Sequence, residues 1–265
     1  MAASDTLYPV KEHSWRQGLG TLIRKENSAW WGTRKWWVQS LVWLAIINGF
    51  FAIMLWLVPL EDPEEALAPA ELKDMFIILF SVFTTIGVIV LSQSAIVGEK
   101  KSGTAEWMMS NPVSRSAFIL AKFVAYGFAI FIILVVLQSV VFYGQLSLSE
   151  GELVTPGPFV LAVLLTSLNL IYFLALTLML GAFFSSRGPV IGIAIGVFIG
   201  QDILAGLLGD FMPWFTEILP QRIMEMAQSV LQGQDPTSYI PLIVLPVSSV
   251  LFILVAMWRF EREEF

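Results

Sequence analysis

Cysteine is absent from the 265 residues, and histidine occurs once, at His13. The lack of cysteine excludes disulfides, thiolate nucleophiles, iron–sulfur clusters and cysteine-ligated zinc. A single imidazole in a polar stretch offers no cluster of ligands, so no metal site is expected. The sequence also lacks a basic, aromatic-rich surface segment, and we therefore expect no nucleic-acid partner.

Charge is scarce as well. Charged residues make up 14% of the chain and hydrophobic residues 57%, whereas about a quarter of a soluble domain is charged. The mean hydropathy is +0.76. The apolar residues form runs of about twenty, long enough to cross a hydrocarbon core of about 30 Å as helices. The sequence therefore predicts an all-α polytopic membrane protein.

Apolar runs place six membrane-spanning helices along the chain. A polar segment, residues 1–35, precedes them, and a short tail, residues 259–265, follows. No short apolar stretch with a cleavage pattern occurs near the start, so we expect the first span to be retained. Residues 36–258 are expected to form a single transmembrane domain, with spans near 36–58, 76–97, 117–143, 159–184, 189–209 and 240–258.

The basic residues predict the orientation. Thirteen of the fifteen Lys and Arg residues lie in the N-terminal segment, the even-numbered connections with the adjoining helix starts, and the C-terminal tail; only Lys73 and Arg222 lie on the other side. By the positive-inside rule, the richer side is cytoplasmic. We therefore expect a multi-pass protein of a prokaryotic plasma (inner) membrane, with both termini in the cytoplasm.

Residues 12–35 alternate aromatic and aliphatic residues with cations, as in Trp15, Leu19 and Trp30 beside Arg16 and Arg24. This pattern is typical of a helix that lies along the membrane surface. The alternative, a plain basic flank of the first span, explains the charge but not the apolar spacing. We therefore favour an interfacial amphipathic helix in contact with the lipid bilayer.

The connection between the second and third spans, residues 98–116, predicts a short helix at the cytoplasmic face. Gly103 allows a tight turn, Thr104 can cap, and about two helical turns can follow. Pro112 disfavours helix at Asn111 and ends it, and Ser114 is placed to cap the third span. A short helix tied at both ends to spans can transmit the movement of a soluble partner.

These residues resemble the first cytoplasmic loop of type-2 ATP-binding-cassette (ABC) permeases. The layout resembles that family too, with an interfacial N-terminal helix, six spans and a longer outer segment before the sixth. The permease of the nitrous-oxide-reductase maturation system is a similar member. The motif that carries the resemblance comprises Glu99, Gly103, Thr104, Glu106, Pro112, Ser114, Arg115 and Lys122.

The resemblance implies that this loop is the coupling helix of a permease dimer, formed by two copies or with a paralogue, and that separate ATPase subunits bind ATP and Mg. The chain contains no G-x-x-x-x-G-K-[ST] motif, and the letters of GEKKSGT have the wrong order. We therefore expect no cofactor on this chain and no enzymatic activity of its own. The residues expected at the ATPase interface are Glu99, Lys100, Lys101, Gly103, Thr104, Glu106, Trp107, Pro112 and Arg115, although an ordinary connector whose lysines only fix topology remains an alternative.

The fifth predicted span carries a strip of glycines at four-residue spacing, Gly188, Gly192, Gly196 and Gly200. Such a strip lets another helix approach closely. Packing within the subunit, a contact at the dimer axis and a wall of the transport path all remain open.

Polar residues within the spans are candidates for the pathway. Asp202 either lines its outer half or lies near enough to the interface to stay hydrated. Asn169 either lines a cavity or links two helices. Residues 210–239 form either a re-entrant outer segment or a simple loop with an amphipathic turn.

We expect a permease subunit that moves a substrate, by export, when partner ATPases hydrolyse ATP. The alternative is a secondary transporter driven by an ion gradient, which usually shows two related halves and ionisable groups at the midplane. An intramembrane enzyme is disfavoured, because the spans contain no nucleophile–base pair. The sequence identifies neither the substrate nor whether an extracytoplasmic accessory protein takes part.

Overall fold

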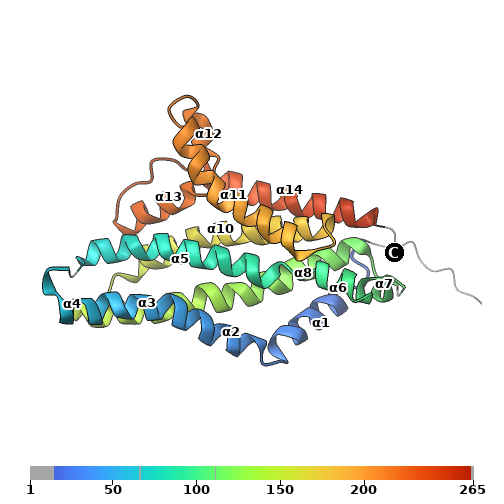
Figure 1. Cartoon of the computed structure of the whole chain (residues 1–265), viewed down its shortest axis with the longest axis horizontal. Coiled ribbons are helices and arrows are strands. Elements are labelled where there is room, and N and C mark those ends of the chain that lie inside the picture. Colours follow the sequence, from blue (N-terminus) through green and yellow to red (C-terminus); the bar gives the residue numbers. More distant parts are fainter. Residues whose placement is uncertain (1–14, 66, 111, 264–265) are drawn as a thin grey trace, which may run out of the picture.

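The computed structural model describes residues 15–65, 67–110 and 112–263 of the chain, and Figure 1 shows them as a bundle of helices. These residues contain helices and no strand. Six helices are long and apolar enough to cross a membrane: Lys35–Glu61, Ala70–Lys101, Arg115–Glu150, Pro156–Phe183, Arg187–Leu208 and Pro241–Glu261. The predicted all-α class with six membrane-spanning helices is confirmed, whereas the orientation of the termini and the roles of the interfacial and coupling helices stay predictions.

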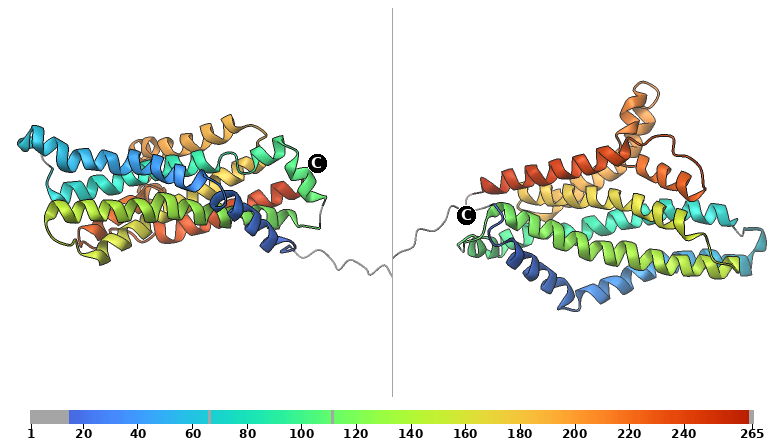
Figure 2. Two further views of the ribbon diagram at one scale, coloured as in Figure 1. Left: turned by 90° about the horizontal axis from the view of Figure 1, so that it is seen from below. Right: turned by 180° about the vertical axis from the view of Figure 1, so that it is seen from behind.

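The first span follows a separate helix, α1 (Leu19–Trp31). In Figure 2 this helix lies at an angle to the bundle, near the end that carries α7. The span itself comprises α2 (Lys35–Trp43), α3 (Gly49–Ala52) and α4 (Val58–Glu61). They are joined by two π-helical turns, η1 (Leu44–Asn48) and η2 (Ile53–Leu57). A π-helical turn leaves the helix continuous but rotates the side chains that follow it. A short 3₁₀ turn, η3 (Pro63–Glu65), begins the first outer connection.

The connection between the second and third spans contains the short helix that the sequence predicts. The second span is α5 (Pro69–Ser92), continued after a turn by α6 (Val97–Lys101). The connection holds α7 (Thr104–Met109). The third span comprises α8 (Arg115–Ile130), η4 (Phe131–Val136) and α9 (Leu137–Glu150).

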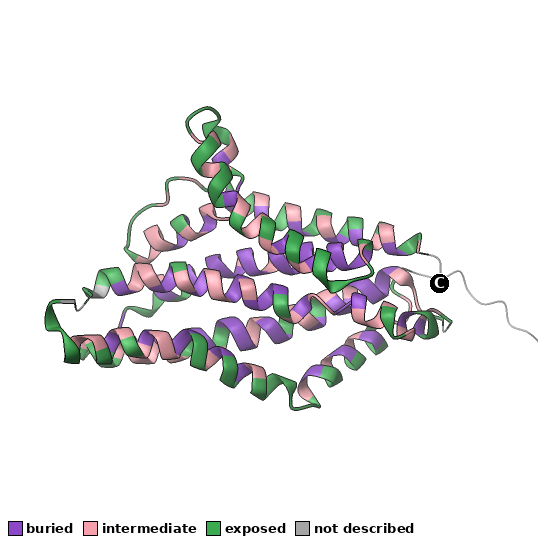
Figure 3. Cartoon of the chain, in the orientation of Figure 1, coloured by how far each residue is buried: buried purple, intermediate pink, exposed green. Residues whose placement is uncertain are grey.

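The fourth span, α10 (Pro156–Phe183), is the central helix: 67% of its most apolar stretch is buried by the rest of the chain, against 17% for α11 (Arg187–Leu208). Figure 3 shows the contrast, with purple along the inner helices and green on the outer end of α11. In Figures 1 and 2 that end projects from the bundle together with α12 (Pro213–Glu217). The sixth span is α14 (Pro241–Glu261).

Stacked aromatic rings lie in the half of the bundle farther from α7. The rings of Phe76 and Phe142 lie 3.8 Å apart and nearly parallel, and Phe51 and Phe159 surround them. Since lipid tails are as apolar as these side chains, close packing rather than water exclusion holds such a cluster together within a bilayer.

Buried amides link the spans by hydrogen bonds. Asn48 donates to the side chain of Gln138 at 2.8 Å, which joins the first and third spans. Asn169 on α10 donates to Thr85 on α5 at 2.9 Å and is almost fully buried. In this arrangement Asn169 therefore makes a helix–helix contact, and its place on a pathway stays a prediction.

The outer segment between α11 and α14 folds back along the bundle. Its second helix, α13 (Arg222–Leu231), buries Ile223, Met226 and Ala227 against α10 and α5. Gln232, just after it, donates to the carboxylate of Asp74. The segment is thus a packed amphipathic helix and not a loose connection.

The orientation of the bundle stays a prediction, and the absence of cysteine makes it easy to test. Lys101 and Glu152 are exposed at opposite ends of the bundle. A single Lys101→Cys variant should react with a membrane-impermeant maleimide only after the membrane is opened, whereas Glu152→Cys should react in intact spheroplasts. Labelling would be read by gel shift, with the cysteine-free chain as blank. The reverse pattern would contradict the predicted topology.

Candidate functional site

The short helix α7 begins at a left-handed residue. Gly103 has φ of 69°, a conformation that only glycine adopts without strain. Its carbonyl accepts from the N–H of Trp107 at 3.1 Å and so begins the helix. Beside it, the hydroxyls of Ser102 and Thr104 are 2.7 Å apart.

The two faces of α7 differ. Ala105 and Met108 are buried against the spans, whereas Glu106 is exposed and Trp107 is 70% exposed. An exposed indole beside a carboxylate is the kind of surface on which a protein partner docks. The helix therefore presents one face to the bundle and one outward.

The segment after α7 is anchored to the start of the chain's described part. Ser114 caps α8 by accepting from the N–H of Ala117 at 3.0 Å, as its position in the sequence predicted. Its own N–H donates to the carbonyl of Gln17 at 3.0 Å, and its hydroxyl donates to the carbonyl of Trp15. Asn111, where we predicted the helix to end, lies outside the described residues.

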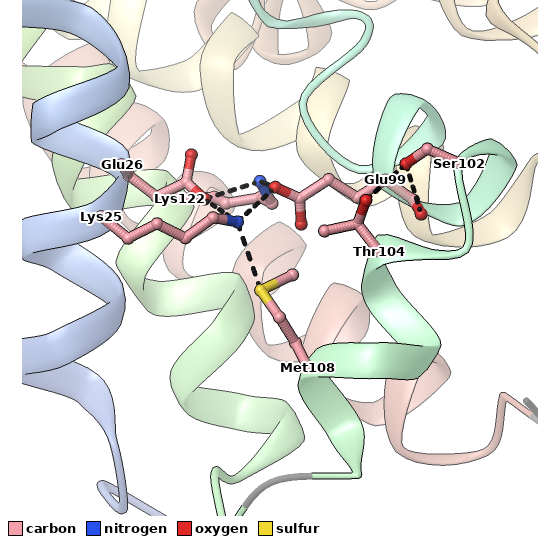
Figure 4. Close-up of polar contacts among 7 residues, drawn as sticks. All are labelled: Lys25, Glu26, Glu99, Ser102, Thr104, Met108 and Lys122. Carbon is pink, nitrogen blue, oxygen red and sulfur yellow. Dashed lines mark hydrogen bonds and ion pairs between the residues drawn. The ribbon is translucent and has the colours of Figure 1, made fainter.

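A cluster of four charged side chains joins α1, α6 and α8 behind α7 (Figure 4). The ammonium of Lys122, 1% exposed, lies 3.0 Å from Glu99 and 3.1 Å from Glu26. The ammonium of Lys25 lies 2.8 Å from Glu99 and 3.3 Å from Glu26. It also contacts the sulfur of Met108 at 3.2 Å, which extends the cluster to α7.

The cluster carries two positive and two negative charges, so its net charge is zero. Burial of Lys122 and Glu26 would be costly without such pairing, and removal of one partner from a buried pair typically costs 3–5 kcal/mol. Burial acts to lower the pKa of Lys25, but the hydrogen bond to Glu99 and the negative charges of Glu99 and Glu26 outweigh it and raise that pKa. Lys25 is therefore charged at neutral pH.

A second set of contacts ties the same connection to the ends of α10 and α14. The ammonium of Lys100 donates to the carbonyl of Ala182 at 2.8 Å and pairs with Glu263 at 2.9 Å. Arg115 donates to the carbonyls of Glu261 at 2.7 Å and Glu263 at 2.6 Å. A cation at the last carbonyls of a helix is stabilising, so these bonds hold the C-terminal end of α14 to the start of α8.

The predicted interface residues thus fall into two groups. Glu99, Lys100 and Arg115 point into the bundle and bind other helices. The side chains exposed outward are those of Lys101, Glu106, Trp107 and Pro112, with Gly103 and Thr104 at the turn between the groups.

Sequence reasoning missed Lys25, Glu26 and Glu263 as partners. A signal for Glu26 was present: Leu22, Glu26 and Trp30 recur at four-residue spacing and are all buried on one face of α1. A carboxylate in the middle of an apolar stripe requires a cation opposite it. Among the described residues, no group of three or more His, Asp or Glu could hold a metal ion.

The glycine strip of α11 faces away from the rest of the subunit. A Cβ atom built on Gly188, Gly192, Gly196 or Gly200 meets nothing within 4 Å. The buried residues of α11, Val190, Ala194 and Gln201, lie on the opposite face. Asp202 is exposed on the outer half of this helix. Close packing within the subunit therefore does not use these glycines in this structure.

The family model described as ABC-2 family transporter protein matches residues 50–265. The chain belongs to the ABC-2 family. No curated protein matches it. The match begins within α3 and includes the connection with α7, so an ABC-2 membrane component carries this short helix and its exposed face. α1 precedes the matched region, and its partnership with Glu99 and Lys122 is shown by the structure alone.

Lys122→Met should lower the free energy of unfolding by about 3 kcal/mol, because it leaves the buried Glu26 and the partly buried Glu99 with Lys25 as their one cation in the cluster. Adding Glu26→Gln should recover part of this loss, since the remaining Lys25–Glu99 pair is balanced. The measurement is unfolding in mixed detergent–dodecyl sulfate micelles, followed by helical circular dichroism. Lys101→Met, at an exposed site, is the matched control, and an equal effect of the two single variants would contradict the role of the cluster.

Proposed function

We propose that this ABC-2 protein is the permease subunit of an ABC transporter and moves its substrate, by export, when separate ATPase subunits hydrolyse ATP. The observation that carries the proposal is α7: a two-turn helix between two spans, with Glu106 and Trp107 exposed and with its opposite face locked to the bundle. The family supports a membrane component with ATPase partners in general.

The proposed coupling follows from the contacts behind α7. A partner that pushes on Trp107 moves Met108, which contacts Lys25 on α1. The same connection is held by Glu99 to Lys122 on α8. The spans therefore tilt together with α7 instead of letting the connection flex, because buried ion pairs resist separation.

The exposed glycine face of α11 supports a dimer. The glycines give a smooth surface on a helix that is only 17% buried within the subunit, and small residues allow close approach of a second helix in a membrane. We propose that two copies, or a copy and a paralogue, meet along this face and that Asp202 lies beside the path between them. Similarity to the permease of the nitrous-oxide-reductase maturation system is part of this proposal and names no substrate.

The first test is purification of the tagged chain from its native membranes. We expect an ATPase with a phosphate-binding loop to copurify, and ATP hydrolysis to be absent from the chain alone. Purification of the chain without any ATPase would contradict the proposal.

Trp107→Ala should weaken binding of that ATPase by about thirtyfold, since loss of a central aromatic contact commonly costs about 2 kcal/mol. The affinity would be measured with the permease in nanodiscs. Trp214→Ala, at a similarly exposed tryptophan on α12, is the matched control and should change binding less than threefold. Unchanged binding by Trp107→Ala would place the docking surface elsewhere.

Gly196→Leu should shift the purified protein from dimer to monomer, because a leucine side chain would separate two helices in contact along the strip. The oligomeric state can be counted by mass photometry in nanodiscs. Gly144→Leu on α9, where an added side chain likewise meets nothing, is the matched control. A dimer that survives Gly196→Leu would remove the strip from the interface.

A further inference from the structure

An apolar groove runs between α8, α10 and α14 on the side of the bundle away from α5, where Figure 2 shows these three helices side by side. Its cavity volume is about 650 Å³. The groove is lined by Trp15, Leu120, Phe123, Ile171, Pro246, Ser249, Val250, Ile253, Leu254 and Met257. The one polar side chain of the lining that lies among the spans, Ser249, already donates its hydroxyl to the carbonyl of Leu245, so the wall offers no unpaired hydroxyl.

The length of the groove corresponds to one leaflet. Pro246 and Met257 mark its ends on α14, and eleven residues of helix rise by about 16 Å. Half of a hydrocarbon core measures about 15 Å. The groove opens to the membrane side, since Val250 and Leu254 in its wall are more than half exposed.

Two Trp–Arg pairs lie at the end of the groove near α7. Trp15 lines the groove, and the guanidinium of Arg16 lies over its ring at 4.4 Å. Trp258 directly follows the lining residue Met257, and Arg262 lies over its ring at 4.2 Å. Indole rings are typical of the depth of lipid headgroups, and cations at that depth attract anionic lipid.

Two carboxylates of the described residues, Glu261 and Glu263, lie at this end, and both have partners on other elements or on α14. Glu261 accepts from the hydroxyl of Ser116 at 2.5 Å. Glu263 is paired with Lys100 at 2.9 Å and Arg259 at 2.7 Å. Among the described residues at this end, five cations outnumber these two carboxylates: Arg16, Lys100, Arg115, Arg259 and Arg262. The mouth of the groove therefore carries a net positive charge and its body is apolar, a combination that complements a phospholipid with a negatively charged headgroup.

We propose that this groove is a binding site for one anionic phospholipid, with an acyl chain between α8 and α14 and the phosphate near Arg16. The site lies on the far side of α10 from α5 and is separate from the exposed face of α7. Binding of the lipid fastens the segment that contains Trp15 to α14, and so connects α1 to the sixth span through a ligand.

The test uses the full chain, stripped of lipid and titrated with palmitoyl-oleoyl phosphatidylglycerol or phosphatidylcholine, with the bound lipid counted by native mass spectrometry. The unmodified chain should bind the anionic lipid more tightly. Val250→Trp fills the groove and should weaken this binding at least tenfold. Val247→Trp is the matched control, because Val247 is similarly exposed on α14 but does not line the groove.

Arg16→Gln should reduce the preference for phosphatidylglycerol about fivefold, the factor expected for one cation near an anionic headgroup, whereas Arg24→Gln should not. If Val250→Trp fails to fold, as judged by circular dichroism, the proposal is tested by Leu254→Trp and by the comparison of Arg16→Gln with Arg24→Gln. Equal binding by Val250→Trp and Val247→Trp, or equal binding of the two lipids, would overturn the proposal. A change of oligomeric state by Val250→Trp with lipid binding intact would also overturn it, because a second copy would then occupy the groove.

Discussion

The arrangement at the foot of the bundle depends on the charge of Lys122. Its side chain is 1% exposed, and an ammonium group at that place is tolerated only beside carboxylates. Glu99 brings the start of the connection to it, and Glu26 brings α1. One buried cation on the third span thus determines where two other segments lie, and α7 is positioned as a result.

The ion pairs around Lys122 join some helices into one unit and leave α11 with an uncovered face. α1, α6, α7 and the start of α8 share ion pairs and packed side chains, and the foot of α14 is joined to them by Arg115. α11 shares far fewer contacts and leaves its glycine face uncovered. A force applied at α7 would therefore reach the second, third and sixth spans through these contacts and the fourth through the bond from Lys100 to Ala182. It would reach α11 only through α10 and α5.

The spans were predictable because their information is local. A run of twenty apolar residues is long enough to cross a bilayer wherever its neighbours lie. Each of the six predicted ranges overlaps one long apolar helix, although the second helix begins earlier, at Ala70, and the third ends later, at Glu150. The capping role of Ser114 was predictable for the same reason. The π-helical turns η1, η2 and η4 were not predicted, and all three lie where the first and third spans contact each other.

Two of the four residues of the charge cluster could be singled out from the sequence. Lys122 and Glu99 belong to the motif, but their inward direction depends on α1, nearly one hundred residues earlier in the chain. Glu26 was readable from its place in the apolar stripe of α1, whereas Glu263 gave no such signal. Long-range pairs of this kind require the fold, because the sequence does not reveal which of fifteen cations meets a given carboxylate.

The partnership of α1 with the connection has a consequence for exchanging parts of this protein with those of another. The matched family region begins at residue 50, yet two of the four charges that hold the connection come from residues 25 and 26. The unit that can be exchanged intact in this chain is therefore discontinuous in sequence, because it comprises both α1 and the connection with α7. A coupling segment transplanted from a relative would arrive without its counter-charges unless the helix at Leu19–Trp31 came with it.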